Sequence, residues 1–86
     1  MKAYSLGIKT RSAQGDSAAI PLFKSAIELD PKFAMAFARL GVSCLNTAQP
    51  ALASENIKTA YALREHVSEP EKLSISAYYF TSLLSG

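Results

Sequence analysis

Few residues in this sequence could support catalysis, and they do not form a recognisable active-site set. His66, the only histidine, follows Arg64 and Glu65 at an expected helix end, where its charged form would interact favourably with the helix dipole. Glu69 and Glu71 fall in the first turn of another expected helix and fit dipole and capping roles there. Because no nucleophile, base and orienting residue can be assembled, we expect that the chain is not an enzyme.

The single cysteine, Cys44, limits metal and redox chemistry in the same way. One thiol cannot form an intrachain disulfide or the thiolate cluster that zinc or an iron-sulfur centre requires. The spacing of its neighbours places Cys44 on the inward face of a helix, where a thiol among apolar groups is unreactive. The sequence also lacks a glycine-rich phosphate loop, so we expect no cofactor and no bound metal.

The chain is short, apolar and lightly charged. It has 86 residues, of which 49% are hydrophobic and 19% are charged, and its formal net charge is +2. A chain of this length forms one small domain, and its apolar composition indicates surfaces that another polypeptide covers. Its lysines and arginines are dispersed and make no basic stripe, so we expect no nucleic-acid binding.

No segment resembles an export signal or a membrane anchor. The N-terminal stretch lacks the continuous apolar region of a signal peptide, and no run approaches the ~20 apolar residues of a membrane helix. Together with the single cysteine, these features favour a reducing, cytoplasmic setting with no membrane partner.

Apolar residues recur at helical spacing along the whole chain, and no run alternates with the period of a strand. One apolar stripe has spacings of three, one, three and one residues, which 3.6 residues per turn places on one helix face: Phe37, Leu40, Gly41, Cys44 and Leu45. The sequence therefore predicts an all-α fold with five helices, near residues 2–13, 17–30, 34–47, 50–66 and 69–84.

Residues typical of helix ends support these boundaries. The run Gly15–Ser17 offers a turn and a capping side chain, Pro31 ends the second helix, and Pro50 suits a first turn. The run Ser68–Glu71 reads as a capping box that begins the fifth helix. Pro21 does not fit, because a proline one turn inside the second helix should cost a hydrogen bond or bend that helix, unless the helix starts later than residue 17.

The sequence repeats itself after 34 residues. Among the first 34 pairs of residues separated by 34 positions, seven are identical, and they are Met1/Met35, Leu6/Leu40, Gly7/Gly41, Ala19/Ala53, Lys24/Lys58, Ala26/Ala60 and Leu29/Leu63. A period of this length indicates a repeat architecture in which each unit is one helical hairpin.

These residues resemble the tetratricopeptide repeat (TPR) family, whose repeat has the same length. The family pattern is a Leu-Gly pair in the first helix, then a small residue, a large apolar residue and a second small residue at fixed spacings in the second helix. The first copy supplies Leu6, Gly7, Ala19, Phe23, Ala26 and a closing Pro31, and the second supplies Leu40, Gly41, Ala53, Ile57 and Ala60. Glycine and alanine at these positions would let the two backbones of a hairpin approach closely.

The resemblance implies a right-handed superhelix of stacked antiparallel helix hairpins in a single domain of about two and a half repeats. Repeat one spans 1–33, repeat two spans 34–67, and a partial third repeat spans 68–86. The sequence departs from the family at Ala3 and Thr10, where the family has large aromatic residues, and at Glu65, which replaces the second closing proline.

The last expected helix is apolar on two sides. Leu73, Ala77, Phe80 and Leu84 form one stripe, and Ile75, Tyr78 or Tyr79, and Leu83 form another. A helix with two apolar faces requires a neighbour on each. Its position at the end of the repeat suggests a piece of a longer superhelix, or a surface that packs on another copy through residues 73–84.

Family members hold a peptide or helix in the concave groove that their first helices line, and the resemblance implies the same here. The family's groove positions correspond to Tyr4, Ile8, Arg11 and Ser12 in the first copy and to Met35, Ala38, Val42, Leu45 and Asn46 in the second. Ile8, Val42 and Leu45 can equally be packing residues, whereas Tyr4 and Arg11 have no core role in the repeat.

Two functions therefore remain open. The first is a protein-interaction module that binds a peptide or helix in the groove, as part of a larger regulatory or scaffold protein. The alternative is a self-associating helical adaptor that forms a homodimer through its exposed C-terminal helix.

Overall fold

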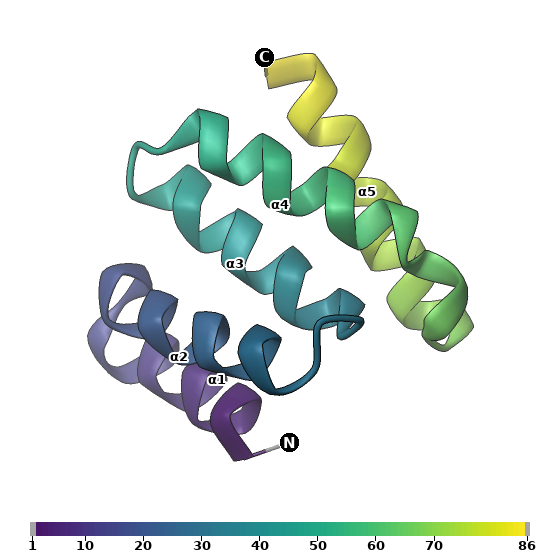
Figure 1. The fold of residues 1–86 in the computed structure, drawn as a ribbon. Coiled ribbons are helices and arrows are strands. Elements are labelled where there is room, and N and C mark those ends of the chain that lie inside the picture. The colour runs from purple at the N-terminus through teal and green to yellow at the C-terminus, as the bar shows by residue number, and fades with distance from the viewer. Residues whose placement is uncertain (1, 86) are drawn as a thin grey trace.

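A computed structural model describes residues 2 to 85 and shows an all-α fold (Figure 1). Within these residues there is no strand. The five helices and one short 3₁₀ turn are α1 (Lys2–Gln14), α2 (Asp16–Leu29), α3 (Ala34–Asn46), α4 (Pro50–Ala62), η1 (Arg64–His66) and α5 (Glu69–Ser85). The prediction of an all-α chain with five helices is confirmed.

The starts of α4 and α5 follow from local residues, whereas Gly15 and Phe33, which precede α2 and α3, form no side-chain capping hydrogen bond. Pro50 occupies the first turn of α4, where its missing N–H costs nothing. At the start of α5, the Glu71 carboxylate accepts hydrogen bonds from the Ser68 backbone N–H at 3.3 Å and from the Ser68 hydroxyl at 3.0 Å. The prediction that the fourth helix runs to residue 66 is wrong, because α4 ends at Ala62 and the chain continues as the 3₁₀ turn.

Pro21 lies inside α2 without ending it. The helix begins at Asp16 and continues to Leu29, so it does not start later to avoid the proline. Proline has no N–H for the Ser17 carbonyl one turn earlier, but both residues are on the exposed side of α2. Water can therefore take the place of the missing donor.

The helices form two antiparallel hairpins followed by a single helix. In Figure 1, α1 and α2 run side by side in opposite directions, as do α3 and α4, and α5 crosses behind α4. A single residue, Gly15, joins α1 to α2, and its φ of 96° lies in the left-handed region that glycine adopts most readily. Helix α2 packs on α3, and α5 packs mainly on α4 and also on α3.

Close approach at two glycines holds each hairpin together. A Cβ at Gly7 would lie 2.7 Å from Cε1 of Phe23, and a Cβ at Gly41 would collide with the Ile57 side chain and lie 3.2 Å from the Ala53 carbonyl oxygen. Both glycines are buried. The expected contact of Gly41 with Ala53 is therefore present, whereas the atoms nearest to Gly7 belong to Phe23 instead of Ala19.

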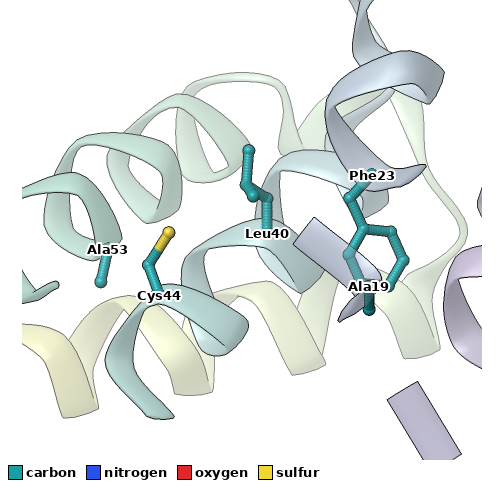
Figure 2. Packing of buried hydrophobic residues seen from close by; sticks show 5 residues of the cluster. All are labelled: Ala19, Phe23, Leu40, Cys44 and Ala53. Atoms are coloured by element: carbon teal, nitrogen blue, oxygen red, sulfur yellow. The ribbon is translucent and has the colours of Figure 1, made fainter. Parts of the chain in front are cut away.

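One apolar cluster connects the two hairpins, and a second connects α5 to the hairpin of α3 and α4. The first contains Ala19, Phe23, Leu40, Cys44 and Ala53, from α2, α3 and α4 (Figure 2). The second contains Ala34, Met35, Ala38, Ala60 and Ile75, from α3, α4 and α5. Helix α3 contributes to both clusters and is the central helix of the domain. No helix within residues 2 to 85 has the length and apolarity required to cross a bilayer.

Candidate interaction surface

The residues assigned to a groove by the family resemblance do not form one open surface. Tyr4 is half-buried, with its ring centroid 4.7 Å from that of Phe33 and 6.0 Å from that of Phe23. It packs against both apolar clusters. The expectation that Tyr4 has no core role is therefore wrong, because this ring fills the space between α1, α2 and the start of α3.

Two further groove positions are buried. Met35 is 5% exposed and Ala38 is fully buried, and both belong to the cluster that contains Ile75 of α5. They cannot contact a peptide in an open groove while α5 packs on α3 and α4. These residues were assigned to the groove from their positions in the repeat, which take no account of where α5 lies.

Three apolar groove positions are half-buried. Ile8 and Leu45 pack against the first cluster, which supports the alternative that they are packing residues. Val42 is also half-buried, and Ser12 is exposed. The part of the chain that the structure describes contains no pocket, so these side chains do not border an enclosed binding site.

The structure brings two of the predicted groove residues, Arg11 and Asn46, together at one carboxylate. The Arg11 Nε donates to Oδ1 of Asp16 at 2.6 Å, and the Asn46 amide donates to Oδ2 at 3.1 Å. The hydroxyl of Ser43, which is fully buried, donates to Oδ1 at 2.9 Å. Asp16 therefore links the first hairpin to α3 through side chains that lie 27 and 30 residues away in sequence.

The environment of Asp16 favours its ionised form. Burial raises the pKa of this carboxyl, but the hydrogen bonds from Arg11, Ser43 and Asn46, with the Arg11 charge, outweigh burial and leave the pKa below the ordinary value of 3.8. Asp16 is also the first residue of α2, where a negative charge complements the helix dipole. We interpret this network as a structural link between the hairpins.

We expect the Asp16→Asn variant to be about 1 to 2 kcal/mol less stable at neutral pH, because it loses charge-assisted hydrogen bonds at a partly exposed site. A carboxyl whose pKa is lowered by folding stabilises the folded state above its unfolded pKa. This contribution is lost as the pH falls through the lower folded value.

The difference in unfolding free energy between wild type and Asp16→Asn should therefore be constant above about pH 5 and should shrink below pH 3.8. Urea titrations at a series of pH values measure this difference. The variant Asp30→Asn is a matched control, since its carboxylate is exposed and accepts only the Lys32 backbone N–H in this structure. An equal pH dependence in both variants would contradict the assignment.

Metal binding and thiol chemistry find no support among the described residues. No group of three or more His, Cys, Asp or Glu side chains lies within reach of a common ion in residues 2 to 85. Cys44 is 2% exposed, and burial raises the pKa of its thiol despite the opposing charge of Lys24. A buried neutral thiol is a poor nucleophile.

Exposed apolar side chains line one face of α5. Leu73 is 69% exposed, Phe80 is 54% exposed and Leu84 is 89% exposed, and Ala77 between them is also exposed. These four residues, which we call the outer stripe, follow spacings of four, three and four and so occupy one side of the helix. Among the described residues, they form the longest run of exposed apolar side chains on a single helix face.

The opposite face of α5 is fixed to the rest of the domain. Ile75 is fully buried, and the rings of Tyr79 and Tyr61 in α4 stack with centroids 4.0 Å apart. The guanidinium carbon of Arg64 lies 4.0 Å from the centroid of the same Tyr61 ring. Of the two apolar stripes predicted on this helix, the one that contains Ile75 packs on the domain, although its Leu83 is 53% exposed.

The outer stripe is also uncharged along its length. No lysine, arginine, aspartate or glutamate occurs between Leu73 and Ser85. The charged residue before this segment, Lys72, forms ion pairs with Glu65 at 3.3 Å and with Glu69 at 3.2 Å. An uncharged, exposed face is suited to an apolar partner when the opposite face of its helix packs on the domain.

Comparison of the chain with protein-family models, curated proteins and solved structures found no significant match. The proposals below therefore rest on the residues and contacts of this chain.

Proposed function

We propose that the chain is a TPR-like protein-interaction module whose binding surface is the outer stripe of α5. In this proposal the hairpins α1–α2 and α3–α4 and the single helix α5 belong to a right-handed superhelix of the TPR type. The partner is a helical segment of another polypeptide, and the module serves a larger regulatory or scaffold protein.

Equal burial at equivalent positions supports the TPR-like arrangement. Ala19, Phe23 and Ala26 in α2 are fully buried, and so are their counterparts 34 residues later in α4, Ala53, Ile57 and Ala60. In each hairpin the glycine of the first helix contacts the large residue of the second helix, Phe23 for Gly7 and Ile57 for Gly41. The two hairpins thus use the same packing at the same interval.

The single observation that carries the proposed function is the exposed apolar face of α5, which no other helix among residues 2 to 85 covers. In α3, Gly41 receives Ile57 and Cys44 lies in the same buried cluster as Ala53. At the 34-residue interval Gly41 and Cys44 correspond to Ile75 and Tyr78, and the exposed Ala77 and Phe80 lie two residues further along α5. A small residue with exposed apolar neighbours on both sides provides a place for a large side chain from a partner helix.

The outer stripe is favoured over the groove because the predicted groove residues are engaged elsewhere. Tyr4, Met35 and Ala38 are occupied in the apolar clusters, and Arg11 and Asn46 are hydrogen-bonded to Asp16. Rearranging them to receive a ligand would expose apolar surface or break these bonds. In the outer stripe, the centroid of the Phe80 ring lies 6.4 Å from that of Tyr61 and 5.6 Å from that of Tyr79, yet Phe80 stays 54% exposed and accessible to a partner.

Selection from a displayed library of amphipathic helical peptides tests this function. The chain is immobilised at low density, so that two copies do not meet. We expect selected peptides to carry a large apolar residue four positions from a small one, like Ala19 and Phe23 in α2. We also expect the Leu73→Glu and Phe80→Glu variants to bind the selected peptides with about 100-fold lower affinity. Each substitution would bury a carboxylate against apolar groups.

The variant Leu29→Glu is the matched control, because Leu29 is 72% exposed, similar to Leu73, but lies at the end of α2. Circular dichroism establishes that each variant is folded. Failure to select any peptide, or equal binding by the wild type and both α5 variants, would refute the proposal.

A further inference from the structure

We infer that the partner of the outer stripe is the same stripe on a second copy of this chain, packed antiparallel about a two-fold axis. This inference depends on the proposed function, since it identifies the helix that α5 binds. It commits the interface to Leu73, Ala77, Phe80 and Leu84 of each copy.

The size pattern of the stripe is complementary to itself. An antiparallel partner that places its Phe80 against Ala77 also places its Ala77 against Phe80, and its Leu84 then meets Leu73. Each large ring thus faces a small residue, as Phe23 faces Gly7 in the first hairpin. Alternating large and small residues across an interface allows helices to pack closely without voids.

The residue sizes that would pack well on the exposed face of α5 are also those that a second α5 presents. In the hairpin of α3 and α4, Gly41 meets a large residue, Ile57, while Cys44 shares a cluster with the small Ala53. On the exposed face of α5, the small Ala77 leaves room for a large residue, and the large Phe80 packs best against a small one. An antiparallel α5 offers its own Phe80 and Ala77 in that order.

Charge also favours a second α5 over α1 of another copy. Pairing two outer stripes brings no charged side chain into the overlap, because Leu73 to Ser85 contains none. The exposed face of α1 carries Lys2 and Lys9 beside Leu6. Packing that face on the outer stripe would place ammonium groups against leucine and phenylalanine, which costs their hydration.

Two-fold symmetry makes the interface self-limiting. In an isologous contact, residue i of one copy meets residue j of the other and the reverse contact occurs at the same time. Both outer stripes are then covered, so the assembly stops at a dimer. An antiparallel pair also places the opposite ends of the two helix dipoles side by side.

Oligomeric state tests the inference. Light scattering during size exclusion, repeated over a range of concentrations, should show wild-type chain and the Leu29→Glu control as dimers. We expect Leu73→Glu to weaken the dimer by about 100-fold or more, because two carboxylates would be buried against Leu84 side chains. A wild-type chain that stays monomeric at every concentration would overturn the inference, and so would a dimer that Leu73→Glu leaves unchanged.

Cysteine cross-linking tests the antiparallel register. Under oxidation, a mixture of Ala77→Cys and Phe80→Cys chains should form a disulfide dimer about tenfold faster than either variant alone, because a disulfide requires a Cβ separation of about 3.5 to 4.5 Å. Wild type is the control, since Cys44 is buried. Faster linkage of Ala77→Cys with itself would indicate a parallel pair and overturn the register.

These experiments separate the inference from the function on which it depends. A monomeric chain that still selects helical peptides through Leu73 would refute the second-copy partner and keep the proposed function. A chain that selects no peptide but dimerises through α5 would support the second copy as the partner and refute binding of other polypeptides.

Discussion

Replacing Phe23 with alanine should lower the free energy of unfolding by about 3 to 5 kcal/mol, the range observed when a buried phenylalanine is truncated in a packed core. Phe23 is fully buried, its ring fills the space above Gly7, and Tyr4 packs beside it. Because Gly7 has no side chain to occupy the resulting cavity, the two helices cannot easily close it.

The effect of Phe23→Ala is large relative to the whole domain. A chain of 86 residues has a stability of roughly 4 to 13 kcal/mol at typical values per residue. Urea unfolding followed by circular dichroism measures the change. The variant Leu29→Ala serves as the control, because this exposed residue should contribute no more than about 0.5 kcal/mol. Similar losses in the two variants would contradict the role assigned to Phe23.

Replacing Gly41 with valine should destabilise the domain by about 3 kcal/mol, at the upper end of the usual range for overpacking. A Cβ at this position collides with the Ile57 side chain near its branch point and approaches the Ala53 carbonyl oxygen to 3.2 Å. Backbone atoms cannot move aside as a side-chain end can, so α3 and α4 must separate.

A matched substitution at Gly7 provides the comparison. The atoms nearest to a Cβ there belong to the Phe23 ring, which can tilt, so Gly7→Val should cost less than Gly41→Val. Thermal and urea unfolding of the two variants give both values. Helix propensity alone predicts no loss on replacing glycine in a helix. A Gly41→Val chain as stable as wild type would therefore refute close approach at this glycine.

The helices and their ends could be predicted from local sequence. The 3.6-residue stripe and the residues at Pro50 and Ser68 act over a few positions, and the five helices appear where these signals occur. The pairing of glycines with the second helices also followed from the 34-residue interval. Two boundary expectations were wrong. Pro21 does not disturb α2, because it lies on the solvent-exposed side of the helix. The last turn expected for α4 is absent, because the helix ends at the turn that begins with Leu63.

The groove could not be predicted in the same way. Its residues were assigned by position within the repeat, which says nothing about neighbours from other helices. Tyr4 found aromatic partners on α2 and beside α3, and Met35 and Ala38 share a buried cluster with Ile75 of α5. Burial depends on the whole set of surrounding helices.

The network at Asp16 likewise depends on tertiary structure. The sequence indicated only a capping role for the turn at Gly15–Ser17. Ser43 and Asn46, three residues apart on a mostly apolar helix, were the available signal that α3 meets a polar group. Their common acceptor is brought to them by the stacking of α2 on α3.

The helical class and the two apolar stripes of α5 can be predicted from local patterns, because they depend on residues within a few turns of one another. Which of those stripes is covered depends on how the helices pack. This packing places Ile75 in the core and leaves Leu73, Phe80 and Leu84 exposed, because burial is a property of contacts between distant segments. The proposed interaction surface follows from that difference.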